Sequence, residues 1–256
     1  MICAGIDAGS RAIKIVLVDS DTYDVLASGT MKQGIEQEAL ALQLFERLLK
    51  EAGVRRSDVS NIVATGYGRN IVGFADTTIT EITCHARGVR HLVDDALTIV
   101  EIGGQDSKLI RLDDGGSVRD FAMNDRCAAG TGRFLEVVAE RLGVRLEDLG
   151  GIAERSRKPA AISSMCVVFA ETEIIGLLAS GAQREDIVAG VQGAMASRVA
   201  AMAGRRLDPP VIFTGGVALI LGMDAALRSA LGHPVALAPD PMMTGALGAA
   251  ILAAAR

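Results

Sequence analysis

Residues 2–21, ICAGIDAGSRAIKIVLVDSD, contain two apolar runs separated by a short turn of small residues, AGS. This pattern predicts a β-hairpin with an acidic residue at the mouth of its turn. Residues 98–114, TIVEIGGQDSKLIRLDD, repeat the pattern, so we expect the chain to carry one structural device twice. Alignment of the two segments pairs three positions at one constant interval: Asp7 with Glu101, Gly9 with Gly103, and Lys14 with Lys108.

The repeated turn has the chemistry of a nucleotide site. Glycines let backbone N–H groups approach phosphate oxygens without an intervening Cβ atom, and a carboxylate at the turn can hold Mg²⁺ through water. One such turn alone would indicate an ordinary hairpin, but its repetition favours two turns that clamp a polyphosphate from both sides. The residues predicted to bind the nucleotide here are Gly9, Ser10, Lys14, Gly103 and Gly104. Those predicted to act in hydrolysis are Asp7, Glu101, Gln105 and Asp106.

Two further segments place glycines at the start of predicted helices. The strand-like run VIFT ends at Gly215 and Gly216, where a base and ribose could lie against bare backbone. The segment MTGALGAAI, which includes Gly245, begins a C-terminal helix of small residues, and taken alone it indicates a tightly packed helix. The chain has no GxGxxG pattern, and GTGRF lacks the Lys-Ser/Thr ending of a Walker loop.

Composition narrows the possible functions. The 256 residues carry a formal net charge of −5, which argues against a protein that binds the phosphate backbone of nucleic acid. The N-terminus has no signal-peptide pattern, and no apolar run approaches the roughly 18–20 residues of a membrane span. We therefore expect a cytoplasmic protein that contacts neither nucleic acid nor membrane. Aromatic residues make up only 3% of the chain, so aliphatic side chains are expected to build the core.

Two of the four cysteines stand in similar settings. Cys127 and Cys166 each precede a predicted helix, and a helix N-terminus lowers a thiol pKa and suits an iron–sulfur ligand. A lone cysteine is more often a small buried hydrophobe, and we apply that interpretation to Cys3 and Cys84. For Cys166 the two interpretations are evenly balanced. Two thiolates cannot complete a cubane, but a symmetric dimer would supply four.

The predicted organisation has two domains with a boundary near Asp95. Residues 1–95 form the first domain and residues 96–256 form the second. A helical segment that carries the two cysteines, residues 124–181, interrupts the second domain. The last helix is expected to pack back on the first domain. His85 and His91 share one predicted helix and lack a third ligand, so we expect a solvated face there. Periodicity predicts helices at residues 36–52, 81–93, 184–206, 218–231 and 244–254.

The order of these motifs resembles a known superfold. GIDAGS, EIGGQDSK, FTGG and TGALGAAI follow one another as in the sugar kinases, Hsp70 and actin. That resemblance implies an α/β fold of two ribonuclease H-like domains with ATP in the interdomain cleft.

A narrower resemblance covers nearly the whole chain. NDRCAAGTGRFLEVVAERL, AISSMCVVFAETEIIGLLASG, ATGYGRN and TEITCHARG closely resemble the ATP-dependent activators of 2-hydroxyacyl-CoA dehydratases, and equally the ATPase subunits of benzoyl-CoA reductases. The chain departs from these relatives at Glu101, where they usually have Asp, and at Leu219 and Ile220, where many have a polar pair.

The narrower resemblance implies a homodimer, or a heterodimer with a related subunit, that holds one [4Fe–4S] cluster through Cys127 and Cys166 of each chain. ATP with Mg²⁺ would drive an electron at low potential to an acyl-CoA dehydratase or reductase component, and a ferredoxin or flavodoxin would supply it. Two alternatives remain: a small-molecule kinase of the same superfold, which iron in the purified protein would exclude as a sufficient account, and a nucleotide-sensing partner without catalysis.

Overall fold

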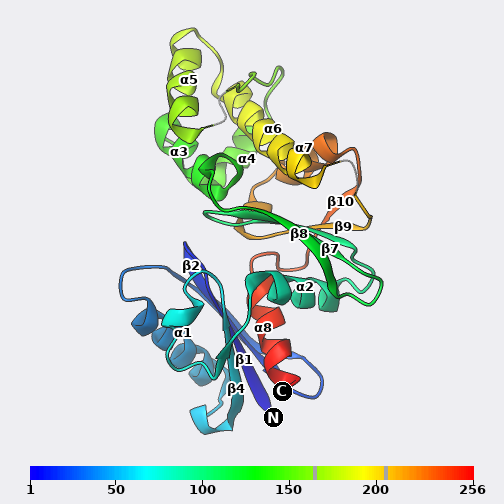
Figure 1. Cartoon of the computed structure of the whole chain (residues 1–256). Helices are drawn as coiled ribbons and strands as arrows, with labels where there is room; N and C mark the ends of the chain where they lie inside the picture. Colours follow the sequence, from blue (N-terminus) through cyan, green and yellow to red (C-terminus); the bar gives the residue numbers. More distant parts are fainter. Residues whose placement is uncertain (164–165, 205–206) are drawn as a thin grey trace. The chain divides into compact units, whose positions relative to one another are not determined.

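A computed structural model describes residues 1–163, 166–204 and 207–256. The chain folds into two compact units (Figure 1). Unit 1 comprises Met1–Ala96, Leu112–Arg119 and Ala238–Arg256, and unit 2 comprises Leu97–Arg111 and Asp120–Leu237. Each unit has its own five-stranded mixed sheet.

The sheet of unit 1 has the strand order β3-β2-β1-β4-β5. Strands β1, β2 and β3 form an antiparallel meander, and β4 and β5 continue the sheet in parallel with β1. The register places Asp7 opposite Lys14, so the predicted first hairpin is confirmed. The strands span Ile2–Ala8 (β1), Ala12–Asp19 (β2), Val25–Lys32 (β3), Val59–Thr65 (β4) and Thr77–Thr78 (β5).

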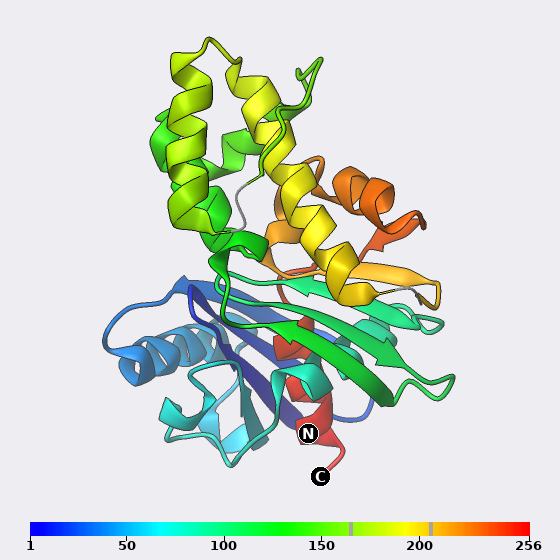
Figure 2. The same ribbon diagram turned by 45° about the horizontal axis from the view of Figure 1, so that its top comes forward.

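Helices cover both faces of this sheet. Helix α1 (Gln37–Ala52) lies on one face, and α2 (Glu81–Leu92) and α8 (Thr244–Ala254) lie on the other (Figures 1 and 2). Alternate residues of β1 point to opposite faces, which sends Ile6 into the core shared with α1 and Cys3 into the core shared with α8. Both cores are largely aliphatic, as the composition predicts.

Helix α8 approaches its neighbours closely enough that backbone meets backbone. A Cβ atom at Gly5 would overlap the carbonyl oxygen of Ala246. One at Gly248 would overlap the carbonyl oxygen of Cys84 on α2. The small residues of this helix are therefore a packing requirement, which agrees with the prediction of a tightly packed C-terminal helix.

The sheet of unit 2 repeats the topology of unit 1. Its order, β10-β9-β6-β7-β8, equals that of unit 1 read from the other edge, with β6 in the place of β1. Strands β6 and β7 are antiparallel and place Glu101 opposite Lys108, which confirms the predicted repeat. The strands span Thr98–Ile102 (β6), Ser107–Leu112 (β7), Val118–Asn124 (β8), Val211–Thr214 (β9) and Val235–Leu237 (β10).

Helices of unit 2 cover one face of its sheet (Figure 1). The core between these helices and the sheet includes Phe134, Met195 and Phe213. Helix α6 ends at Ala203, before the predicted end at residue 206; residues 205–206 lie outside the described residues. The helices are α3 (Gly132–Leu142), α4 (Leu149–Ala153), α5 (Val167–Ala179), α6 (Arg184–Ala203) and α7 (Met223–Leu231).

The prediction of a helix from residue 218 is wrong at its start. Residues Gly216–Leu219 form a 3₁₀ turn, and α7 begins only after Gly222, whose φ of 86° interrupts any continuous helix. A left-handed residue cannot stand inside a right-handed helix.

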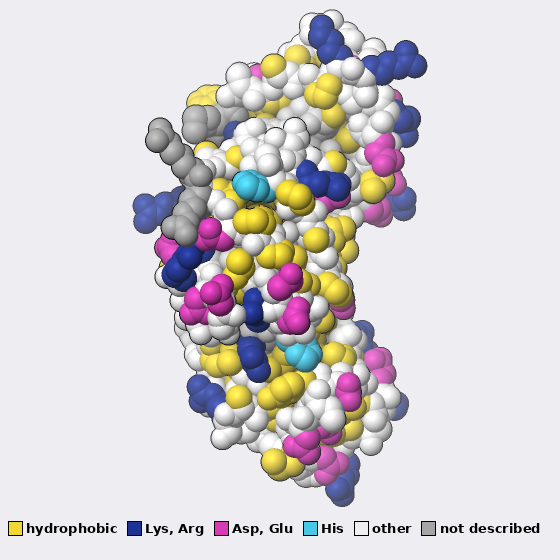
Figure 3. All heavy atoms as spheres, turned by 90° about the vertical axis from the view of Figure 1, so that its right-hand side faces the viewer, with side chains coloured by type: hydrophobic (Ala, Val, Ile, Leu, Met, Phe, Trp, Pro, Cys, Tyr) yellow, Lys and Arg dark blue, Asp and Glu magenta, His cyan; other side chains and the backbone are white. Residues whose placement is uncertain are grey.

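No described helix is long and apolar enough to cross a membrane. On the face shown in Figure 3, acidic and basic side chains are intermixed over the described residues.

Candidate functional site

The turn of the first hairpin holds a buried ion pair. Asp7 is 6% exposed, and its Oδ2 accepts a hydrogen bond from Lys14 Nζ at 3.0 Å. A Cβ atom at Gly9 would lie 2.9 Å from the backbone carbonyl oxygen of Ala12 and 2.8 Å from Lys14 Nζ, so the turn leaves little space for a side chain at this position. Ser10 follows in the turn, half-buried. Asp7, Gly9 and Lys14, which the sequence grouped here, meet in unit 1, and Ser10 belongs to the same turn.

Two other segments of unit 1 surround the Asp7 carboxylate. Gly66 follows β4 with φ of 90°, and a Cβ atom there would lie 2.5 Å from Asp7 Oδ1. A Cβ atom at Gly245, at the start of α8, would lie 3.3 Å from Asp7 Oδ2. Gly68 N–H donates to the carbonyl of Ala8 at 2.8 Å. The carboxylate therefore lies among bare backbone from three segments.

Gly66 was not predicted as a site residue. Its signal was the Gly-x-Gly sequence directly after a buried strand, because neighbouring parallel strands end at the same edge of a sheet. In the structure β4 is parallel to β1 and places Thr65 beside Asp7.

The prediction that both histidines lie on a solvated face is wrong for His85. His85 is 5% exposed, its Nδ1 lies 3.0 Å from Thr244 Oγ1, and its ring contacts the position that a Cβ of Gly245 would take. A polar partner on α8 makes burial of the imidazole tolerable. His91 is exposed and meets Tyr23 edge to face, with 5.9 Å between ring centroids.

The turn of the second hairpin adds a second carboxylate. Lys108 Nζ donates to Glu101 Oε2 at 2.9 Å and to Asp106 Oδ2 at 2.8 Å. The lysine side chain is 2% exposed and that of Glu101 is 6% exposed. These three side chains together carry a net negative charge, which suits a divalent cation.

Glycines again open the space beside this acid. Gly215 has φ of 91°, and a Cβ atom there would lie 2.6 Å from Glu101 Oε1. Gly103 closes the turn through its N–H, which donates to the carbonyl of Asp106 at 3.0 Å. Gly104 is half-buried in the turn, whereas Gln105 and Gly216 are exposed.

The predicted nucleotide residues therefore fall into two groups, one in each unit. In unit 1 the group is Asp7, Gly9, Ser10, Lys14 and Gly245; in unit 2 it is Glu101, Gly103, Gly104, Gln105, Asp106, Gly215 and Gly216.

The cysteines divide into a buried and an accessible pair, and none of the four is in a disulfide. Cys3 and Cys84 are buried, as predicted, and burial raises the pKa of Cys84 to about 12. Cys127 is half-buried and occupies the N-cap position of the 3₁₀ turn Ala128–Gly130 that leads into α3, without a capping hydrogen bond from its side chain. Cys166 is exposed and occupies the N-cap position of α5, again without a capping hydrogen bond from its side chain.

Asn124 holds the Cys127 loop through both of its side-chain groups. Its Oδ1 accepts from Cys127 N–H at 3.0 Å, and its Nδ2 donates to the carbonyl of Cys127 at 2.8 Å. Within the described ranges of this chain, no group of three or more His, Cys, Asp or Glu side chains could hold a metal ion.

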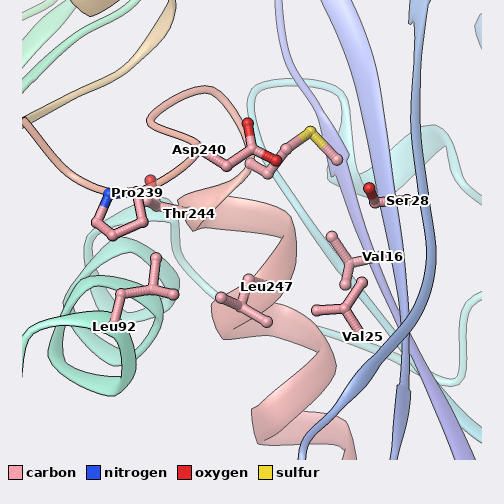
Figure 4. Close-up of a pocket in the computed structure, with 9 residues that line it drawn as sticks. Val16, Val25, Ser28, Leu92, Pro239, Asp240, Thr244 and Leu247 are labelled. Carbon is pink, nitrogen blue, oxygen red and sulfur yellow. The ribbon is translucent and has the colours of Figure 1, made fainter.

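A cavity of about 110 Å³ lies elsewhere in unit 1 (Figure 4). Its lining is mainly apolar, and no predicted site residue contributes to it. Thr244, the partner of His85, forms part of its wall. Burial raises the pKa of Asp240, another lining residue. Nothing in the lining selects a particular ligand.

Comparison with known proteins gives matches over the full chain. The model of the BadF/BadG/BcrA/BcrD ATPase family matches residues 4–253. The activator of lactoyl-CoA dehydratase from Anaerotignum propionicum is 44% identical over 99% of this chain and 97% of that protein.

Two solved structures resemble the whole molecule. The activator of the 2-hydroxyisocaproyl-CoA dehydratase from Clostridium difficile, with bound ADPNP, has a TM-score of 0.94 and 40% identity, covering 100% of this chain and 95% of that one. Component A of the (R)-2-hydroxyglutaryl-CoA dehydratase of Acidaminococcus fermentans has a TM-score of 0.95 and 39% identity, with 100% of both chains covered.

More distant likenesses bear on the fold and on the alternatives. A subunit of benzoyl-CoA reductase from Thauera aromatica is 34% identical over 100% of this chain and 94% of that protein. A ROK family glucokinase from Streptomyces griseus has a TM-score of 0.61 at 16% identity, covering 100% of both chains, a likeness of fold alone. The predicted fold class, that of the actin and sugar kinase superfold, is confirmed.

Proposed function

Because the chain belongs to the BadF/BadG/BcrA/BcrD ATPase family, we propose that it hydrolyses ATP to activate a 2-hydroxyacyl-CoA dehydratase. The observation that carries this proposal is 44% identity to an activator of lactoyl-CoA dehydratase, with nearly all of both chains covered. The alternative function, as a subunit of a benzoyl-CoA reductase, rests on 34% identity to a subunit of that enzyme. Because this identity is lower than the 44% identity to the activator, the comparison favours the activator. Four cysteines outside any disulfide suit a reducing compartment such as the cytoplasm.

The two carboxylate–lysine turns are the proposed nucleotide and magnesium residues. In each turn the lysine neutralises a buried acid, and glycines leave backbone free to approach phosphate oxygens. We assign Mg²⁺ binding through water to Asp7 and Glu101, because Mg²⁺ keeps most of its hydration. Gln105, the exposed residue of the second turn, or Asp106 would orient the attacking water.

Cys127 and Cys166 are the proposed ligands of a [4Fe–4S] cluster. Both thiols are accessible, outside any disulfide, and placed at the N-terminal ends of helical segments, where thiolate is stabilised. Two thiolates from this chain and two from a second chain would supply the four ligands that such a cluster needs. When bound, the cluster would supply an electron of low potential to the dehydratase.

Activation of a dehydratase tests the proposed function. The chain is purified without oxygen, reduced, and mixed with the dehydratase and ATP. Wild-type protein should activate it with ATP and fail with ADPNP. Asp7→Asn should abolish both ATP hydrolysis and activation while the bound iron remains, because Asp7 lies in a different unit from Cys127. Equal activation with and without ATP would contradict the proposal.

A further inference from the structure

The nucleotide turn of unit 2 is joined directly to the helix that follows Cys127. Gly132 N–H donates to the carbonyl of Gly103 at 2.8 Å, and Arg133 N–H donates to the carbonyl of Gly104 at 2.9 Å. These donors belong to the first turn of α3, whose N–H groups have no partner inside the helix. The turn proposed to hold phosphate therefore satisfies the helix end.

The contact is tight as well as hydrogen-bonded. A Cβ atom at Gly132 would lie 3.1 Å from Gly103 O and 3.3 Å from Gly104 Cα. A methyl group at this position would therefore force the turn or the start of α3 to shift by a few tenths of an ångström. Because the two backbones touch without intervening side chains, a shift of the turn cannot be absorbed by a rotamer change.

The chain between this contact and Cys127 is short and internally bonded. Thr131 is fully buried, and both its N–H and its Oγ1 donate to the carbonyl of Ala128, at 3.1 and 2.8 Å. Gly130 N–H donates to the carbonyl of Cys127 at 3.5 Å, and Asn124 holds Cys127 from the other side. These hydrogen bonds tie the Cys127 loop to the start of α3.

We infer that Gly132 is a positioning residue that transmits the state of the nucleotide turn to the Cys127 loop through these two backbone hydrogen bonds. The inference rests on the proposed function for its nucleotide, and it concerns residues of unit 2 alone. The inference predicts that a nucleotide bound at residues 103–104 changes how often the backbone hydrogen bonds of residues 128–133 open.

Hydrogen–deuterium exchange of the full-length chain, with and without MgADPNP, tests the inference. Three peptides are followed: residues 101–108 for the turn, residues 127–135 for the Cys127 loop, and residues 184–203 as a reference. In wild-type protein the nucleotide should slow exchange in the first two peptides. One net hydrogen bond corresponds to about a fivefold change in a local opening equilibrium, so an effect of about that size is expected in the loop.

Two substitutions at Gly132 are designed to disturb the contact between α3 and the turn while the nucleotide still binds at the turn. Gly132→Ala places a methyl group against Gly103 O. Gly132→Pro removes the N–H donor and points its ring Cδ at Gly103 O, which lies 2.8 Å from Gly132 N, so it breaks this contact outright. Proline is otherwise favoured at the first position of a helix, and the extended Thr131, with φ of −134° and ψ of 169°, suits a following proline. Gly193→Ala on α6 is the matched control, because nothing lies within 4 Å of its Cβ position.

In both Gly132 variants the nucleotide should still protect residues 101–108, while its effect on residues 127–135 falls below about twofold. Gly193→Ala should behave as wild type. The inference is overturned if wild-type protection stops at the turn, or if Gly132→Pro keeps the full effect in the loop. A nucleotide that protects neither peptide would instead overturn the proposed nucleotide site. If the protein contains no iron but the nucleotide still slows exchange in residues 127–135, only the proposed cluster is overturned.

Discussion

Replacement of Lys108 by methionine should destabilise unit 2 strongly, because this lysine is the shared partner of two acids. Its side chain is 2% exposed, and that of Glu101 is 6% exposed, whereas that of Asp106 is 28% exposed. Methionine fills a similar volume but carries no charge. The main loss of folding free energy therefore comes from the buried Glu101 carboxylate, which no longer has the Lys108 ammonium beside it. Removal of one partner from a buried ion pair costs about 3–5 kcal/mol.

Lys14→Met is the matched control in unit 1. Lys14 is 17% exposed and pairs with the carboxylate of Asp7, so water can reach the pair and the expected loss is about half as large. Urea unfolding measures both variants. At about 2–4 °C per kcal/mol for a chain of this size, Lys108→Met should also lower Tm by roughly 6–20 °C.

The double variant Lys108→Met/Glu101→Gln isolates the electrostatic part of the cost. Neutralising the acid removes the uncompensated charge, so the double variant should be more stable than Lys108→Met alone. The reasoning is refuted if Lys108→Met lies within about 1 kcal/mol of wild type, or if Glu101→Gln adds to its loss.

Three further predictions concern the cysteines and the packing of α8. Cys127→Ser and Cys166→Ser should each lose bound iron while far-UV circular dichroism stays unchanged, since neither side chain is fully buried; an iron-replete variant would refute the ligand assignment. Gly248→Ala should cost more than about 3 kcal/mol in urea unfolding because its methyl group would overlap a backbone carbonyl, whereas Gly193→Ala should stabilise by about 0.5–1 kcal/mol; equal effects would contradict the packing. Burial raises the pKa of the Cys84 thiol from 9.0 to about 12, so its contribution to stability is intact below pH 9 and lost as pH rises toward 12; Cys84→Ala should show a shallower alkaline loss than wild type, and an unchanged slope would count against it.

The features that the sequence predicted correctly are those that depend on residues close together in the chain. The two hairpins and their repetition follow from alternation and a repeated turn, and both are confirmed. The pairing of Asp7 with Lys14 and of Glu101 with Lys108 is a finding of the structure that the sequence reasoning did not predict. The small residues of α8 likewise indicated close packing. These features need no knowledge of which segments meet in space.

The features that sequence reasoning missed depend on contacts between distant segments. His85 was assigned to a solvated face because its partner, Thr244, lies on the last helix. Gly66 approaches Asp7 only because β4 pairs with β1. Gly132 was visible as part of a glycine-rich helix start, but its contact with Gly103 follows from the packing of α3 on the hairpin turn.

The content of iron and acid-labile sulfide per chain, after purification without oxygen, tests the central claim most directly. If two chains share one four-iron cluster through Cys127 and Cys166, each chain should carry about two iron and two sulfide ions. A chain that hydrolyses ATP but is colourless and free of sulfide would contradict the account.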